Sequence, residues 1–201
     1  MRRSALFEWV LVLAIAIGLA LAVQSYAVKP YRIPSESMEP TLQVGDRVLV
    51  DRFSHNLGSE PAVGQIVVFH PPAGADSVTP RCGMAGQGGG TETPCSRPTS
   101  SASSQTFIKR VVGVAGDRIA IRGGRVVRNG RLRSEPFASR CGPGADCDFS
   151  HAITVPDDHV YVMGDNRGHS EDSRYWGPVP ITWVIGKAVL IYWPPGEAGS
   201  P

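Results

Sequence analysis

The apolar residues of this 201-residue chain form one long run near the N-terminus and a series of short runs after it. The long run extends from Trp9 to Val28, contains no charged residue and has Glu8 at its edge. As a helix, a run of this length spans about 30 Å, which is enough to cross a lipid bilayer. The pattern therefore predicts one transmembrane helix at residues 9–28, with residues 1–8 as a cytoplasmic N-terminus.

The alternative for this run is a cleaved secretion signal, because Ala20-Leu21-Ala22 offers a small-x-small site whose cleavage would release a secreted β domain. Secretion signals have shorter apolar regions of roughly 7–15 residues, which favours a retained anchor. Arg2 and Arg3 favour a cytoplasmic N-terminus, although Lys29 and Arg32 weaken the charge bias. No second run of this length follows. The prediction is a single-pass protein of the cell membrane whose remaining chain lies on the outer face.

The short apolar runs after the anchor are typical of β-strands, because they are rich in β-branched residues and bounded by glycine, proline or aspartate. They lie at residues 47–53, 65–69, 107–114, 118–122, 159–163 and 184–193. Gly123-Gly124 and Asn129-Gly130 are turn signals, and the first is expected to close a hairpin. The predicted fold after the anchor is mostly β.

Residues 71–104 lack such runs and are dense in glycine, proline, serine and threonine. A segment of this composition buries little apolar surface, so we expect a mobile surface insertion.

Four cysteines fall into two local pairs, Cys82 with Cys95 and Cys141 with Cys147. Outside a membrane, a disulfide within each pair is the simplest interpretation. A four-cysteine zinc site is an alternative, but the cysteines lack the paired CxxC spacing of such sites. Free thiols are a further alternative for the pair inside the insertion. No metal site and no cofactor are predicted.

The charge balance argues against nucleic acid as a partner, because the net charge is +2 and there is no basic tail. The arginines of residues 118–133 alternate with apolar residues, which is typical of a strand with a solvated face. Only three of the twenty basic residues are lysines, namely Lys29, Lys109 and Lys187. A buried lysine can lose its proton and an arginine cannot, so Lys109, in an apolar run, is a candidate titratable amine. Lys187 also lies in an apolar run and is the alternative.

The stretch from Ile33 to Leu42 holds two serines, Ser35 and Ser37, between Pro34 and Pro40. Prolines fix φ and disfavour helix, so a rigid extended loop is expected to hold the two hydroxyls in place. A serine is a poor nucleophile unless a base takes its proton. The five histidines are scattered, without the spacing of a triad or a metal site. A catalytic role for either serine therefore depends on a base elsewhere in the chain.

Three stretches together resemble the signature boxes of bacterial type I signal peptidases (leader peptidases). Residues 35–42, Ser-Glu-Ser-Met-Glu-Pro-Thr-Leu, with Gly45-Asp46, are similar to the nucleophile box. Residues 109–113, Lys-Arg-Val-Val-Gly, with Gly116-Asp117, are similar to the lysine box. Residues 164–167, Gly-Asp-Asn-Arg, and residues 170–174 are similar to the third. The resemblance covers the chain from the anchor to about residue 194, apart from insertions, and implies a serine protease with a Ser-Lys dyad, active in signal peptide processing during protein secretion.

The resemblance assigns roles to the site residues. It makes Ser37 the nucleophile and Lys109 the general base. The Ser37 backbone N–H and the Ser35 hydroxyl are expected to form the oxyanion hole, although an ordinary loop serine is the alternative for Ser35. Ser170 is expected to hydrogen-bond the Lys109 amine and orient it.

The charged residues of the third box are expected to brace the site. Asp172 and Arg174 would form an ion-pair network, and Asp165 and Arg167 would support it in a similar way. Residues 168–169 depart from the family pattern, since Gly and His stand where Asp and Asn are usual.

Substrate specificity in this family comes from shallow apolar pockets for small side chains, which implies cleavage after an Ala-x-Ala pattern. The matching positions here are Tyr31, Ile33, Pro34, Met38, Leu42, Phe107 and Ile108. We expect the signal peptide of a secreted preprotein to bind as an added strand beside Ile33 or Phe107. Membrane lipid is the other expected partner, and the protein is expected to lie near the secretion translocon.

The resemblance also implies a signal-peptidase-like β catalytic core at residues 29–114 and 157–194. A smaller inserted β lobe is expected at residues 115–156 and a disordered tail at residues 195–201. One alternative is a soluble self-cleaving repressor-type Ser-Lys protease, which the anchor and the lack of a helix-turn-helix disfavour. Another is a non-catalytic membrane-tethered β protein that binds secreted chains, which the intact Ser37 and Lys109 disfavour.

Overall fold

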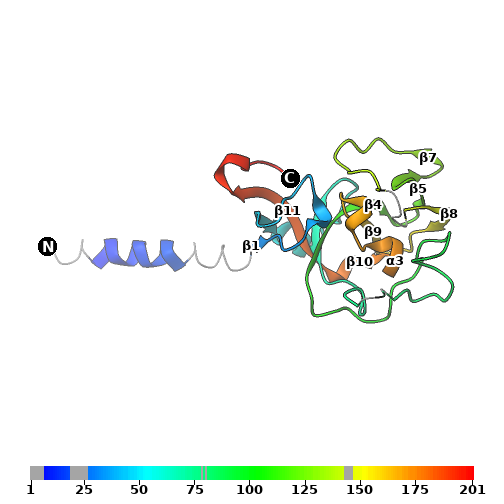
Figure 1. The fold of residues 1–201 in the computed structure, drawn as a ribbon. Coiled ribbons are helices and arrows are strands. Elements are labelled where there is room, and N and C mark those ends of the chain that lie inside the picture. The colour runs from blue at the N-terminus through cyan, green and yellow to red at the C-terminus, as the bar shows by residue number, and fades with distance from the viewer. Residues whose placement is uncertain (1–6, 19–26, 78, 80, 143–146) are drawn as a thin grey trace.

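The computed structural model of the protein describes residues 7–18, 27–77, 79, 81–142 and 147–201 (Figure 1). A helix at residues 7–18 precedes a β domain that contains the rest of the described chain. Within the described ranges, no helix is both long and apolar enough to cross a membrane. The predicted transmembrane helix of residues 9–28 includes residues 19–26, which lie outside the described residues. Its last predicted residue, Val28, begins a β-strand instead.

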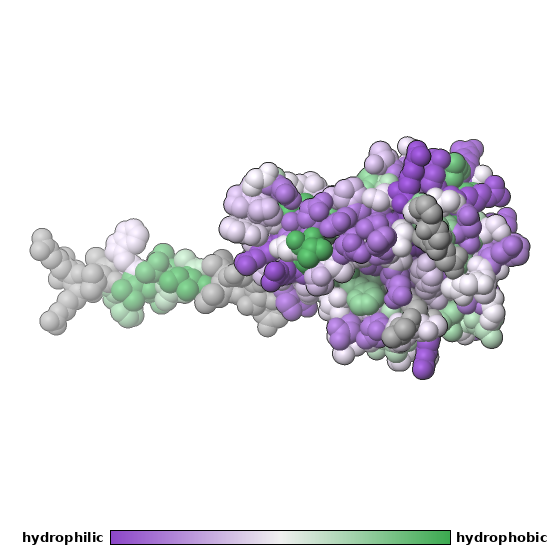
Figure 2. Space-filling model, viewed as in Figure 1, coloured by the Kyte–Doolittle hydropathy of each residue, from purple (hydrophilic) through white to green (hydrophobic). Residues whose placement is uncertain are grey.

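Apart from Glu8, the side chains of the helix at residues 7–18 are apolar, and they are exposed. Trp9 is 74% exposed and Leu13 is 61% exposed. Figure 2 shows this helix as an apolar band, next to a β domain whose visible face is mostly polar. Removal of apolar surface from water is favourable, and a contiguous exposed apolar surface of this kind is typical of an interaction site that the described residues leave uncovered.

Seven strands form the main sheet in the order β1-β2-β11-β3-β4-β9-β10, and all neighbouring pairs are antiparallel. Their bounds are Val28–Arg32 (β1), Arg47–Asp51 (β2), Val184–Trp193 (β11), Ile66–Phe69 (β3), Phe107–Val114 (β4), His159–Met163 (β9) and Val179–Pro180 (β10). Side chains of β3 alternate between two hydrophobic cores, Val67 and Phe69 in one, Ile66 and Val68 in the other. The sheet is therefore packed on both faces.

Four strands form a second sheet in the order β7-β6-β5-β8, within the residues predicted as an inserted lobe. Their bounds are Arg131–Leu132 (β7), Arg125–Arg128 (β6), Arg118–Arg122 (β5) and Phe149–Thr154 (β8). The predicted hairpin at Gly123-Gly124 joins β5 to β6, with both glycines at positive φ. Ile119 and Phe149 of this sheet share a core with Tyr161 of β9. The lobe is thus continuous with the main sheet rather than a separately packed unit.

Short helical turns connect the strands. They are η1 (Glu36–Met38), α2 (Phe53–Asn56), η2 (Arg167–His169), α3 (Ser173–Trp176), η3 (Ile181–Trp183) and η4 (Pro195–Glu197). The tail predicted as disordered folds back onto β11, because the Ile191 and Gly199 backbones exchange hydrogen bonds of 2.7 and 3.1 Å. Backbone pairing thus orders a segment with little apolar surface of its own.

The segment predicted as a mobile insertion, residues 71–104, is packed against the domain at both ends. Ala75 is fully buried in the core. Pro72 and Ala102 form a β-bridge, and the Cys95 N–H donates to the Arg174 carbonyl at 2.9 Å. Both predicted disulfides are present, Cys82–Cys95 in this segment and Cys141–Cys147 in the lobe. The segment was predicted to be mobile because it can bury little apolar surface. A disulfide and backbone hydrogen bonds hold it in place instead.

Candidate active site

Ser37 and Lys109 are brought together from two elements 72 residues apart. Ser37 lies in η1, inside a loop between β1 and β2 whose base is closed by backbone hydrogen bonds between Ile33 and Asp46 and between Gly45 and Ile33. Lys109 lies on β4, opposite Val67 of β3. The Lys109 Nζ donates to the Ser37 Oγ at 2.5 Å, and the two residues are only 5% and 7% exposed. The geometry is that of a nucleophile in direct contact with a base.

Burial lowers the pKa of Lys109 from 10.5 to about 8. Removal of water disfavours the ammonium form and is the largest cause. The negative charge of Asp172 opposes it by raising the pKa, and the positive charge of Arg174 lowers the pKa further. The amine can thus be neutral near physiological pH, which a proton acceptor requires.

The Ser35 hydroxyl lies beside that of Ser37, with 3.4 Å between the two Oγ atoms. Ser35 is exposed and has an extended backbone, with φ −139° and ψ 160°. Its hydroxyl is therefore free of the constraints of a packed side chain, and it faces the same space as the candidate nucleophile.

Residues of the third box hold the Ser37 turn from behind. The Asn166 N–H donates to the Ser37 carbonyl at 3.1 Å, and the Asn166 Nδ2 donates to the Glu36 carbonyl at 3.2 Å. Gly164 lies between this turn and Ser170. A Cβ on Gly164 would overlap both the Ser37 carbonyl oxygen and the Ser170 Oγ. Only glycine allows so close an approach, and the sequence pattern did not indicate this requirement.

Ser170 has a different partner from the one expected. Its Oγ donates to the Asp172 Oδ2 at 2.9 Å, rather than making the expected hydrogen bond with the Lys109 amine. The same carboxylate accepts a hydrogen bond of 3.0 Å from the Gly164 N–H. Ser170 and Gly164 are therefore linked through Asp172, so these residues of the third box form a connected unit next to the Ser37 turn.

Asp172 and Arg174 form a fully buried ion pair, with the Arg174 Nε 2.8 Å from the Asp172 Oδ1. Burial alone would raise the pKa of the Asp172 carboxyl, but Arg174 and several hydrogen bonds more than offset this and lower the pKa. Arg174 also donates to the carbonyls of Arg167 and Ser170, both at 2.8 Å. The pair thus fixes the backbone of the third box as well as its charges.

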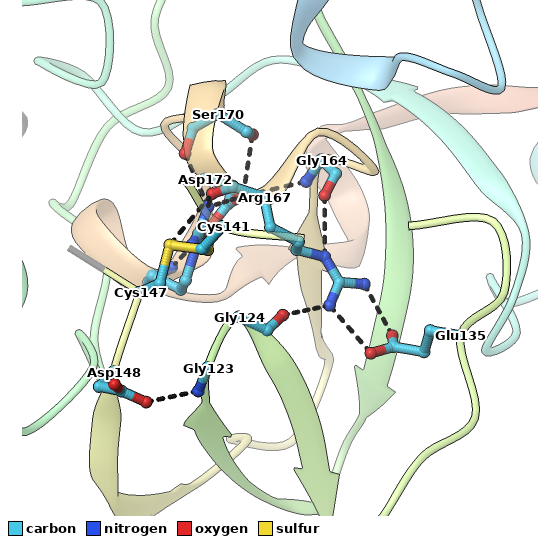
Figure 3. The surroundings of a disulfide bond; sticks show 11 residues. Gly123, Gly124, Glu135, Cys141, Cys147, Asp148, Gly164, Arg167, Ser170 and Asp172 are labelled. Atoms are coloured by element: carbon cyan, nitrogen blue, oxygen red, sulfur yellow. Dashed lines mark hydrogen bonds and ion pairs between the residues drawn. A yellow bond between two sulfur atoms is a disulfide. The ribbon is translucent and has the colours of Figure 1, made fainter. Parts of the chain in front are cut away.

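Asp165 and Arg167 of this box have partners that the sequence did not indicate. Asp165 accepts from Arg110 at 2.7 Å and from Thr41 at 2.6 Å. Arg110 faces away from the Lys109 side of β4, as alternation along a strand requires. Arg167 pairs with Glu135 of the second lobe at 2.7 Å, beside the Cys141–Cys147 disulfide (Figure 3). These hydrogen bonds and ion pairs join the loop between β1 and β2, strand β4 and the lobe around the site.

A cleft of about 1080 Å³ opens over Ser35, Ser37 and Lys109. Pro34, Phe107 and Ile108, three of the predicted pocket residues, line it. The other four do not line it: Ile33, Met38 and Leu42 are buried in a hydrophobic core, against which Tyr31 packs. Apolar side chains of the loop between β1 and β2 thus anchor the loop in the core instead of lining the cleft.

Nowhere in the described part of the chain do three or more His, Cys, Asp or Glu side chains gather as metal ligands. The groups around the cleft can provide a nucleophile, a base and hydrogen-bond donors.

Comparison with known proteins shows the family of the chain. Residues 6–193 match the profile of the family described as signal peptidase, peptidase S26. A signal peptidase I from Leptolyngbya laminosa is 34% identical over 98% of this chain and 86% of its own length. A signal peptidase I from Mycobacterium tuberculosis is 35% identical over 98% of this chain and 76% of its own length. The crystal structure of a signal peptidase I from Enterococcus faecalis aligns with 64% of this chain and 97% of its own, at 22% identity and a TM-score of 0.40. This chain therefore belongs to the signal peptidase family, peptidase S26, and is a peptidase.

Proposed function

We propose that this protein is a membrane-bound serine endopeptidase that removes signal peptides from translocated preproteins, with Ser37 as nucleophile and Lys109 as general base. The hydrogen bond of 2.5 Å between the Lys109 Nζ and the Ser37 Oγ carries the proposal. The burial that lowers the pKa of Lys109 to about 8 supports it, since a neutral amine can accept the serine proton.

The proposed reaction has two steps. In the first, the Ser37 Oγ attacks the scissile carbonyl carbon while its proton passes to Lys109. The resulting ammonium then protonates the leaving amine, and an ester on Ser37 remains. In the second, Lys109 takes a proton from water, which attacks the ester carbonyl carbon; the Lys109 ammonium then returns that proton to the Ser37 Oγ as the ester bond breaks and the product acid leaves. The Ser37 N–H and the Ser35 hydroxyl donate to the oxyanion that forms in each step, and one such donor is typically worth about 10²–10³ in rate.

Cleavage after an Ala-x-Ala pattern is proposed from the apolar lining of the cleft near the dyad. Pro34, Phe107 and Ile108 lie there beside Ser37 and Lys109. Side chains of this kind close to the nucleophile favour small apolar residues on the substrate. The peptide is proposed to bind as an extended strand along the segment that begins β4.

Membrane lipid is proposed as the covering of the exposed apolar helix at residues 7–18. The anchor is proposed to extend through a single span, with the N-terminus cytoplasmic and the catalytic domain on the outer face, near the secretion translocon. The β domain has three tryptophans. Trp176 is fully buried and Trp183 packs against the core. Trp193 is 51% exposed, and the Arg47 guanidinium lies 5.9 Å from its ring centroid. Trp193 is therefore the one suited to the lipid interface.

Contact of Trp193 with lipid is expected to be visible by fluorescence. In the full chain reconstituted into vesicles with brominated lipids, Trp193→Phe should lower the fraction of tryptophan emission that is quenched. Trp183→Phe serves as the control and should not lower it, because Trp183 is partly buried. Equal quenching in wild type and Trp193→Phe would place this end of β11 away from the bilayer.

The pH dependence of cleavage is expected to follow the protonation of Lys109. Below its pKa of about 8 the amine carries a proton and cannot accept another, so kcat/KM should fall about tenfold per pH unit as the pH decreases. Above that pKa the rate should level off. Docked substrate excludes more water, so the midpoint for kcat should lie lower than that for kcat/KM. Profiles of both parameters test this, and a rate that rises with acidity would contradict a lysine base.

The proposed function is tested with a synthetic signal-peptide substrate in detergent. Wild type is expected to cut after the second alanine of an Ala-x-Ala site, and Ser37→Ala is expected to lose nearly all activity while folding normally. A substrate with phenylalanine in place of that second alanine is the matched control and should remain intact. If folded wild type is inert on the alanine peptide yet binds it, the protein is a binding module instead.

A further inference from the structure

The insertion contributes a wall of the cleft that holds the dyad. Gln87 and Gly89 of this segment line the cleft, together with Tyr175 of α3. Gln87 and Gly89, like Thr79 of the same insertion, lie on the same cleft surface as Ser37 and Lys109, although more than a dozen residues separate them in sequence from any signature box. Substrate that enters the cleft therefore meets the insertion as well as the catalytic groups.

A covalent bond and short hydrogen bonds hold the shape of this wall. Cys82 and Cys95 close it with a disulfide, and the Gly83 N–H donates to the Arg97 carbonyl at 2.9 Å. The residues from Cys82 to Arg97 are called the 82–97 loop below. Inside it, the Gln87 Oε1 accepts from both the backbone N–H and the hydroxyl of Ser96, at 2.9 and 2.6 Å. The disulfide and these hydrogen bonds therefore hold the 82–97 loop in one defined conformation.

The 82–97 loop is also docked on the elements that carry the third box. The Cys95 N–H donates to the Arg174 carbonyl at 2.9 Å. A Cβ on Gly88 would lie 2.7 Å from the Tyr175 carbonyl oxygen, so the two backbones are in direct contact there. On the other side, the His151 N–H of β8 donates to the Glu92 carbonyl at 3.0 Å. The loop is thereby fixed relative to the dyad.

The cleft is larger than the residues beside the scissile bond require. Its volume of about 1080 Å³ slightly exceeds the range of about 300–1000 Å³ that is typical of sites for a drug-sized molecule. Two small side chains near Ser37 occupy only part of this space. We propose that the 82–97 loop binds the polypeptide beyond the residues adjoining the scissile bond, so that it selects for long substrates over short ones. This inference rests on the proposed function of the cleft.

The loop can be removed at a point where its ends already meet, because Gly83 and Arg97 are hydrogen-bonded to each other. The variant joins Gly83 directly to Arg97 and carries Cys82→Ser, which leaves no unpaired thiol. Two peptides share one Ala-x-Ala site: one ends within a few residues of the scissile bond, and the other carries a full signal sequence and the start of a mature chain. We expect the deletion to lower the long-to-short ratio of kcat/KM about tenfold.

Binding measured without cleavage separates this inference from the proposed function. In a Ser37→Ala background, the Kd of the labelled long peptide should rise about tenfold when the loop is removed. Cys141→Ser with Cys147→Ser is the matched control, since it removes a disulfide outside the loop, and the long-to-short ratio should stay as in wild type. A folded deletion variant with an unchanged ratio and an unchanged Kd would overturn the proposal. Wild type that binds the long peptide but cuts neither would instead count against the proposed function alone.

Discussion

Replacement of Lys109 by methionine is expected to abolish cleavage, with a loss in kcat on the order of 10⁴ or more. Methionine keeps much of the length and apolar packing of lysine but cannot accept the proton of Ser37, to which the Lys109 Nζ now donates at 2.5 Å. The same substitution is expected to stabilise the fold. Lowering the pKa of a buried amine from 10.5 to about 8 costs the folded protein about 3 kcal/mol at neutral pH, because each pKa unit corresponds to about 1.36 kcal/mol.

The stability gain has a defined pH dependence. Between pH 8 and 10.5 the unfolded wild-type chain binds more protons at Lys109 than the folded one, so wild-type stability rises with pH across this window. The advantage of Lys109→Met should therefore be largest below pH 8 and shrink towards 10.5. Denaturant unfolding at several pH values measures it. Lys187→Met is the control, because the Lys187 amine is partly exposed and lies 3.9 Å from Asp51. This variant should keep its cleavage activity. An active Lys109→Met enzyme would place the base elsewhere.

Replacement of Gly164 by alanine is expected to lower kcat by about 10² or more, since a displacement of 1 Å at a nucleophile can cost that much. The added methyl would overlap the Ser37 carbonyl oxygen and the Ser170 Oγ. Both are held by hydrogen bonds, Ser37 by Asn166 and Ser170 by Asp172, so neither can move away without disturbing the site. Kinetics with the synthetic signal peptide measure the effect.

The loss must be distinguished from simple unfolding. Overpacking of this kind typically costs about 1–3 kcal/mol, which a folded domain of ordinary stability survives. Gly196→Ala is the matched control, because a Cβ at Gly196 meets nothing within 4 Å. Near-wild-type kcat in a folded Gly164→Ala protein would show that the Ser37 turn tolerates displacement.

Strands were predictable from the sequence where the hydrophobic pattern was regular. The runs that became β2, β3, β4, β5, β9 and β11 are all present. Strand β8 was missed for a physical reason: Ile119 pairs with Ile153, but Ile121 pairs with Phe149, so a register shift breaks the two-residue repeat. Strand β1 was missed because it contains Pro30 and charged residues, so that it lacks the apolar pattern of a strand. It is a strand because it pairs with β2 in the folded protein.

The sequence predicted the parts of the candidate site that depend on residue type and local motifs, but not the contacts between distant residues. The sequence indicated Ser37 and Lys109, and the structure places them in contact. It did not indicate the ion pair between Arg167 and Glu135, because partners 32 residues apart are chosen by the fold and not by a local pattern. Nor did it indicate that Met38 would be used as a core residue, since an apolar side chain in a loop serves equally well for a pocket or for an anchor.

The start of β1 at Val28 limits how far the nucleophile can travel from the end of the N-terminal segment. Ser37 lies nine positions after Val28, and nine peptide steps span at most about 30 Å when the chain is fully extended. β1 is moreover hydrogen-bonded to β2 along its whole length, so this part of the connection is held in the sheet and is not flexible. With the preceding segment in a bilayer, as proposed, the enzyme would sample only a thin layer of space next to the lipid. Folded proteins farther out would escape it by distance alone, whatever sequence they expose.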